Sequence, residues 1–245
     1  YKGRAVPEPV LGWALTSPLL SLSTGSRHLT LTLGFAAESP PLHEVWPQAA
    51  GDLAAAIDSA PFRFEVSTAD GFLALRPVAI RLGTYARLRD GQKESADALA
   101  DALQVTLELP DTAPAVVAAP VGGRALTDPT LRVMLRSLPI RTDAGDRYGA
   151  QYPAWASRRL LACHLAIAVQ GLGGLTLASD DRPIDPRKPF EPFGSQPAAG
   201  SRFMIGHPEL VSRPLDSIAF SFSWLAAPAD LQDHYRPSGI VGAGP

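Results

Sequence analysis

Residues that could bind a metal ion or act as a nucleophile are few and widely spaced. The five histidines are His28, His43, His164, His207 and His234. No two of them stand at the i, i+2 or i, i+4 spacing that would bring two imidazoles together on a strand or a helix. The chain has no Gly-x-Ser-x-Gly nucleophile elbow, and its one cysteine, Cys163, sits in an apolar alternation typical of a buried structural thiol. We therefore expect no metal, no cofactor and no catalytic nucleophile.

Glycines and carboxylates give equally little sign of catalysis. Gly171-Leu172-Gly173-Gly174 lies between two strand-like runs and has no lysine, which favours a hairpin turn over a phosphate-binding loop. Asp180 and Asp181 are adjacent, so in an extended chain their side chains point apart, and turn chemistry explains them. Glu191 is flanked by apolar residues and is interpreted as solvated. We expect no enzymatic activity and no small-molecule substrate; a β-sandwich hydrolase is the least supported alternative.

A proline- and phenylalanine-rich loop is the most distinctive stretch. Residues 189–197 read Pro-Phe-Glu-Pro-Phe-Gly-Ser-Gln-Pro, and three prolines without an N–H exclude a helix there. Its phenylalanines either pack on the sheet that they border or dock against a neighbouring subunit, and both can hold, because a stiff apolar loop loses little entropy on binding. The predicted subunit-interface residues are Phe190, Glu191, Pro192, Phe193, Gly194, Gln196 and Pro197, with Arg202 and Arg213 at the rim.

The elements that would position this loop are predominantly strands. Apolar residues alternate with polar ones, at the period of two typical of half-buried strands, in residues 29–35, 62–66, 72–75, 103–109, 131–135, 163–169, 175–177 and 215–224. Asp70-Gly71 predicts a hairpin turn. Apolar spacing of three and four residues predicts short helices in 49–60 and 93–102, and residues 142–152 are predicted to be a polar loop. The 21 glycines and 24 prolines also favour short strands and turns.

A breaker-rich stretch suggests how the chain is divided. Residues 110–129 contain Pro110, Pro114, Pro120, Gly122, Gly123 and Pro129, which is typical of a domain junction. We predict a mainly β protein with two antiparallel β-sandwich-like subdomains and one or two short helices. Residues 1–120 form the first, with the helices, and residues 121–245 form the second, with the loop at 189–206. Because the chain begins at Tyr1, we expect both to be part of a longer protein.

Charge and hydropathy exclude several classes of partner. Charged residues make up 19% of the chain and the net charge is −2, so nothing favours binding to nucleic acid. No apolar run reaches 18 residues and no secretory signal is visible, so we expect no membrane span.

Two stretches resemble the baseplate J-like wedge proteins of extracellular contractile injection systems, of the antifeeding-prophage and virulence-cassette type. Residues 190–206 match the family's aromatic loop, 213–218 its strand start, and Trp224 its strand-ending tryptophan, followed by His234-Tyr235. Near the start, residues 12–20 and 25–32 resemble a second family pattern, with Thr24 where an acidic residue is usual. Together the two stretches make the resemblance extend over most of the chain.

The resemblance implies a structural role. Such a protein would belong to the baseplate wedge and contact other wedge and hub proteins, with sheath or fibre proteins as further candidates. It would act in assembly and in triggering contraction. It would assemble in the bacterial cytoplasm and then be part of a released or cell-associated particle. The alternative from the residues alone is a carbohydrate- or receptor-binding β-sandwich of a tail fibre or adhesin. Trp46, Tyr148, Tyr152 and Trp155 are the aromatic residues that could form its platform.

Overall fold

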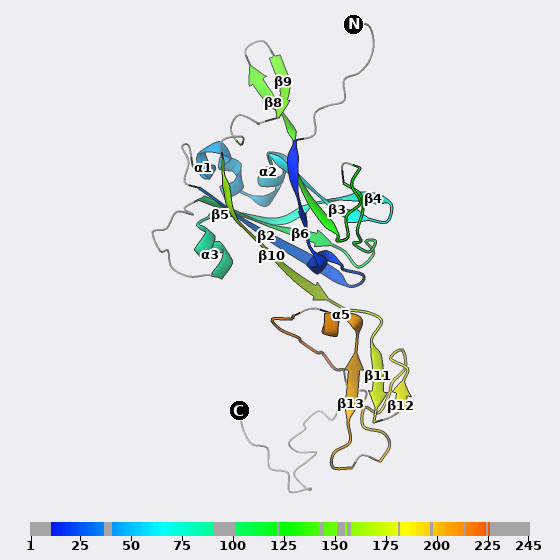
Figure 1. The fold of residues 1–245 in the computed structure, drawn as a ribbon. Coiled ribbons are helices and arrows are strands. Elements are labelled where there is room, and N and C mark those ends of the chain that lie inside the picture. The colour runs from blue at the N-terminus through cyan, green and yellow to red at the C-terminus, as the bar shows by residue number, and fades with distance from the viewer. Residues whose placement is uncertain are drawn as a thin grey trace, which may run out of the picture. The chain divides into compact units, whose positions relative to one another are not determined.

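The protein is mainly β, with its strands in antiparallel sheets, as predicted. The computed structural model describes residues 11–36, 41–90, 101–121, 123–142, 145–150, 155, 158–180, 182–196, 198–212, 214–223 and 225. The chain divides into two compact units, Tyr1–Gly173 and Gly174–Pro245 (Figure 1). Each unit is described by itself below.

One four-stranded sheet of unit 1 has the order β1-β7-β3-β4. Its strands are β1 (Gly12–Thr16), β7 (Thr130–Leu135), β3 (Phe62–Thr68) and β4 (Gly71–Leu75). Phe62, Phe64 and Val66 of β3 are buried, as their alternation predicted. The predicted hairpin turn is confirmed: Thr68 pairs with Gly71, whose φ of +118° suits a glycine.

The other four-stranded sheet has the order β10-β2-β6-β5. Its strands are β10 (Leu160–Gln170), β2 (Ser26–Phe35), β6 (Asp101–Leu109) and β5 (Pro77–Gly83). The alternating leucines of β2 are fully buried, and β6 directs Leu103, Val105, Leu107 and Leu109 into the same core. The two central strands therefore supply much of the apolar interior.

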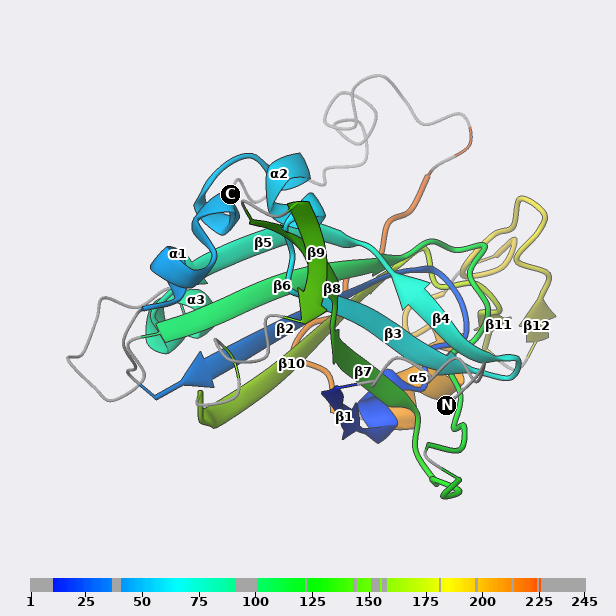
Figure 2. The same cartoon turned by 90° about the horizontal axis from the view of Figure 1, so that it is seen from above.

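The two sheets share one hydrophobic core, which makes unit 1 sandwich-like (Figure 2). Leu31 and Val105 come from one sheet, and Phe64 and Leu131 from the other. Trp155 joins them at the side, with its ring edge-on to Phe35 of β2 at 6.1 Å and to Phe62 of β3 at 4.6 Å between centroids.

The breaker-rich stretch after β6 is anchored inside unit 1. Arg27 of β2 is fully buried, and its guanidinium donates hydrogen bonds of 2.8–3.2 Å to the carbonyls of Leu22, Pro110, Ala113 and Pro114. The predicted boundary at 120/121 is therefore wrong. Proline and glycine interrupt the strands there and leave backbone carbonyls without a strand partner. The buried Arg27 side chain donates hydrogen bonds to these carbonyls instead.

Strand pairing contradicts that boundary independently. β7 and β10 lie after residue 120, yet they pair with β1 and β3 and with β2, all of which lie before it. The sandwich therefore extends to the end of β10, and the units separate at Gly173/Gly174.

The helices of unit 1 are short. They are α1 (Leu42–Val45), α2 (Leu53–Asp58) and α3 (Tyr85–Asp90), with 3-10 turns η1 (Pro18–Leu20) and η2 (Pro47–Ala50). The helix predicted over 49–60 is confirmed only at α2, where Asp52 caps the backbone N–H groups of Ala54 and Ala55. The second predicted helix lies mostly outside the described residues, and its last two positions, Asp101 and Ala102, belong to β6.

The predicted polar loop at 142–152 contains a strand. β8 (Ser137–Thr142) and β9 (Gly145–Ala150) pair as an antiparallel hairpin. Polar and glycine residues there suggested a loop because the strand carries no apolar alternation.

Unit 2 holds a three-stranded sheet of order β12-β11-β13. Its elements are β11 (Thr176–Ser179), β12 (Arg182–Ile184), β13 (Phe203–Gly206) and the short helix α5 (Pro208–Ser212). The strand predicted over 215–224 is absent from its described part, residues 214–223. The predicted hairpin at 171–174 is also wrong, because β10 and β11 lie in different sheets.

Candidate functional site

The candidate site is an aromatic cluster on the small sheet of unit 2. In β11 and β13, Leu177 lies opposite Ile205, and Ser179 lies opposite Phe203. Ile184 of β12 also lies opposite Leu177. Because residues opposite each other share a face, these side chains form one apolar face of the sheet.

Phe203 is the centre of this cluster. The ring of Phe190 stacks on it at 5.7 Å between centroids, and the ring of Phe193 meets it edge-on at 6.5 Å. Phe222 meets its ring edge-on at 6.3 Å, and Phe220 stacks on Phe222 at 6.4 Å. We call these five side chains the phenylalanine cluster.

The phenylalanine cluster is only partly enclosed. Phe190 and Phe193 keep 38% and 44% of their surface exposed, and Phe220 and Phe222 keep 49% and 56%. Aromatic groups of this size normally bury most of their area in a core or at an interface. The rings therefore pack on the sheet and on one another and still present a contiguous apolar surface to solvent, which a monomer rarely does without a binding role.

Short backbone contacts hold the loop in place. Gly194 has a φ of +78°, and its N–H donates to the carbonyl of Glu191 at 3.1 Å, closing a turn between the two loop phenylalanines. Arg202 is tied to Asp180, whose carboxylate accepts from the Arg202 N–H at 3.1 Å and whose own N–H donates to the Arg202 carbonyl at 2.8 Å. The second pair of contacts thus ties Arg202, just before β13, to Asp180, just after β11.

The predicted interface residues lie together, where the structure describes them. Phe190 and Phe193 meet through Phe203, Pro192 between them is half-buried, and Glu191 is exposed as interpreted from the sequence. Gly194, Gln196 and Arg202 are exposed on the same loop. Pro197 and Arg213 lie outside the described residues.

Three members of the phenylalanine cluster were missed from the sequence. Phe203 lies inside the predicted loop at 189–206 but was not among the predicted interface residues, and Phe220 and Phe222 were expected in a strand. The rings of Phe220 and Phe222 do stack on each other, but a period of two does not tell whether another sheet covers that side.

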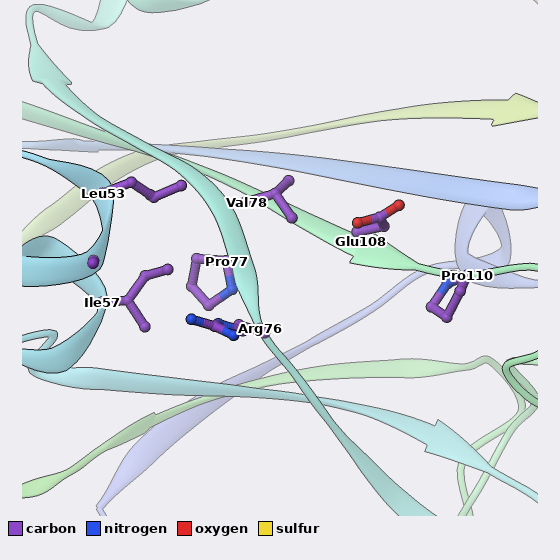
Figure 3. A pocket seen from close by; sticks show the side chains of 8 residues that line it. Leu53, Ile57, Arg76, Pro77, Val78, Glu108 and Pro110 are labelled. Carbon is purple, nitrogen blue, oxygen red and sulfur yellow. The ribbon is translucent and has the colours of Figure 1, made fainter.

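An open pocket lies in unit 1 (Figure 3). It has a volume of about 640 Å³ and lies between α2 and β5, where Leu53 and Ile57 of the helix face Pro77. Arg76 and Glu108 are its charged groups, and the Glu108 carboxylate also lies 3.8 Å from Nε2 of His28. At that separation the pair makes no short hydrogen bond of the kind that activates a nucleophile.

Other groups singled out from the sequence have different surroundings. Cys163 is exposed on β10, which contradicts the prediction of a buried thiol, because β10 is the edge strand of its sheet and is covered less than the central strands. Trp46 and Trp155 are buried in the core, so they do not form an exposed binding platform. Within the described ranges, no three His, Cys, Asp or Glu side chains are grouped to hold a metal ion.

Comparison with known proteins assigns no family. No family model matches the chain, and no curated protein matches it with significance. None of the helices in the described part of the chain is long and apolar enough to cross a membrane.

Proposed function

We propose that this protein is a structural component of the baseplate wedge of a contractile, phage-tail-like injection particle. The observation that carries the proposal is the phenylalanine cluster, which is a preformed apolar surface on a loop of limited freedom. Phe190 is already stacked on Phe203 and Phe193 meets it edge-on, so docking a partner orders few additional side chains. The resemblance of residues 190–206 to the wedge family supports the choice of particle.

The composition of the surface fits a protein partner. Large aromatic side chains dominate the energetics of protein interfaces, with polar groups at the rim. Here Glu191, Gln196 and Arg202 are exposed polar residues in the same stretch as Phe190 and Phe193. In a wedge, such a contact would hold neighbouring subunits in the arrangement that precedes contraction, and its rearrangement would release the sheath. This function requires interfaces with two stable arrangements and no reaction centre.

The alternative of a carbohydrate- or receptor-binding module is supported less well. Two of the four aromatic residues that could have formed its platform, Trp46 and Trp155, are core residues. Sugar platforms depend on exposed rings beside hydrogen-bonding groups, whereas the rings of the phenylalanine cluster lie against one another. A positive glycan-binding result with purified protein would favour this alternative.

The proposal is tested in the complete particle. Residues 190–197 are replaced by a Gly/Ser linker of equal length in the full parent protein, and the particles are imaged by electron microscopy. We expect particles that lack an intact baseplate or sheath, while the purified variant keeps the circular dichroism of the sandwich.

A point variant separates the apolar contact from loop length. Phe193→Ser removes one exposed ring, and Ser195→Ala on the same loop, outside the predicted interface residues, is the control, which we expect to assemble normally. Complete, contractile particles from the linker variant would mean that the loop serves local packing only. A parent organism that makes no such particles would contradict the baseplate assignment itself.

A further inference from the structure

In one four-stranded sheet of unit 1, the edge strand β10 has backbone groups that no described strand pairs with. β10 is the outer strand of the order β10-β2-β6-β5, and it pairs with β2 along its length. On its other side no described residue forms a ladder with it. With 11 residues, β10 is a long edge, and long unpaired edges are templates for a further strand.

β10 has few of the usual protections against pairing: an irregularity at Leu160/Ala162 affects its start, and the register is regular from Ala162 to Gln170. Residues 160–170 include no Lys, Arg, Asp, Glu or Pro, which are the residues that block edges in other proteins. Leu165, Ile167 and Val169 pack against the core but stay half-exposed. The opposite face carries Ala166 and Ala168, both exposed, between the polar side chains of His164 and Gln170.

Residues 215–223 are the complementary case, a strand-like segment without a sheet. Ile218, Phe220 and Phe222 are each about half exposed and alternate with Ala219 and Ser221. The segment has no strand assignment in the structure. Its β-branched and aromatic residues on one side and small residues on the other are typical of a strand at the margin of a sandwich.

We propose that residues 215–223 of one copy of this chain add as a strand to the free edge of β10 in a second copy. The faces match: Ile218, Phe220 and Phe222 would lie beside Leu165 and Ile167 and extend the core face. The small residues of both strands would share the outer face. No described residue pairs with this edge or with this segment, so both are open to a second copy.

The pairing is head-to-tail, because one copy supplies the segment and the other supplies the edge. Without reciprocal exchange such contacts generate rings or open filaments, and with it they generate a closed dimer, so a covalent dimer is the smallest product in either case. On docking, Phe222 exchanges its contact with Phe203 for the core face of the partner, and Phe190 and Phe193 remain on Phe203. The inference stands on strand geometry and does not depend on the baseplate assignment.

Disulfide cross-linking tests whether the two strands pair and which side chains of the segment lie on the same face as Cys163. Single cysteines are introduced at each position from Ser217 to Phe222 in the 245-residue chain, with Cys163 on β10 as the natural reporter. A second series uses Cys163→Ser with Ile167→Cys, so that another register is also sampled. Opposed residues on neighbouring strands are close enough for a disulfide. After mild oxidation at pH 8.5, we expect a covalent dimer when the new cysteine stands at position 218, 220 or 222. We expect no dimer when it stands at position 217, 219 or 221.

The same series contains the results that would overturn the proposal. Removing the β10 cysteine must abolish the dimer, and a dimer that survives would show segment-to-segment contact instead. A cross-link within one chain, seen as a monomer of altered mobility, would show that no second copy is involved. Equal cross-linking at even and odd positions, or none in either series, would also contradict it.

Reversible association supplies a readout that needs no new cysteine. In sedimentation velocity, we expect the mass of the wild-type chain to rise with concentration. Phe220→Lys should remove this rise, and the neighbouring Ser221→Lys, on the outer face, should keep it. Unchanged association in Phe220→Lys, or a wild-type chain that stays monomeric throughout, would overturn the inference.

Discussion

A single buried arginine connects two distant parts of the sandwich. Arg27 donates to the carbonyls of Leu22 and of Pro110, Ala113 and Pro114, so it holds the irregular segment after β6 against β2. Carbonyls that lose a buried charged donor have no water to replace it. We expect Arg27→Met to lower the free energy of unfolding by about 3 kcal/mol in urea denaturation, since hydrogen bonds to charged groups are the strong ones.

The matched control for Arg27 is Arg63, whose side chain is half-exposed and lies 3.6 Å from the Glu65 carboxylate. Arg63→Met should cost less than about 1 kcal/mol, because exposed ion pairs contribute little. Equal losses in the two variants would contradict the anchoring role of Arg27.

The thiol of Cys163, on the edge strand β10, is exposed but has a raised pKa. Burial by its neighbours raises the pKa of the Cys163 thiol, although the side chain is reachable from solvent. The thiolate is the reactive form, so at mildly alkaline pH the folded chain should be alkylated more slowly than the chain in urea. The difference should vanish once the pH exceeds both pKa values. Mass spectrometry of iodoacetamide labelling checks this, and faster labelling of the folded chain would contradict it.

At the scale of elements, one close approach fixes α3 on its sheet. A Cβ at Gly34 of β2 would lie 2.8 Å from Cδ2 of Tyr85, the first residue of α3. We expect Gly34→Ala to destabilise unit 1 by about 1–3 kcal/mol, as overpacking does. In a Tyr85→Ala background the same change should cost much less, and a denaturation double-mutant cycle measures the difference. Additive effects would show that Tyr85 does not cause the strain.

Strands with a buried face could be predicted from the sequence, because burial on one side imposes a period of two. β2, β3 and β6 lie where the alternation of Leu29, Phe64 and Val105 indicated. The same period failed for residues 215–223, since alternation records a capacity to pair and no described strand pairs with them. β9 was missed for the converse reason: it pairs without an apolar face.

The candidate site could be predicted only in part. Phe190 and Phe193 stood out because prolines isolate them in a loop. Their meeting through Phe203 depends on the register of β11 with β13, a long-range pairing that local sequence does not specify. The division between units was mistaken for a related reason, since breaker density does not reveal the hydrogen bonds of Arg27.

At the scale of the whole molecule, the two units differ in how much they bury. Unit 1 has a large shared core, whereas the buried residues in the described part of unit 2 are Leu177 and Ser179. Protection from hydrogen exchange follows the stability of each cooperative region. In exchange mass spectrometry of the free chain, we expect β11 and β13 to exchange orders of magnitude faster than β2 and β6. Equal protection would mean that unit 2 is stable without a partner.

That difference bears on function, because a small sheet with exposed phenylalanines gains most stability when a partner covers it. The measurement that tests this most directly is hydroxyl-radical footprinting of Phe190 and Phe193 in the free chain and in the assembled particle. We predict strong labelling of both rings in the free chain and protection in the particle. Equal labelling in the two states would contradict an assembly contact at the phenylalanine cluster.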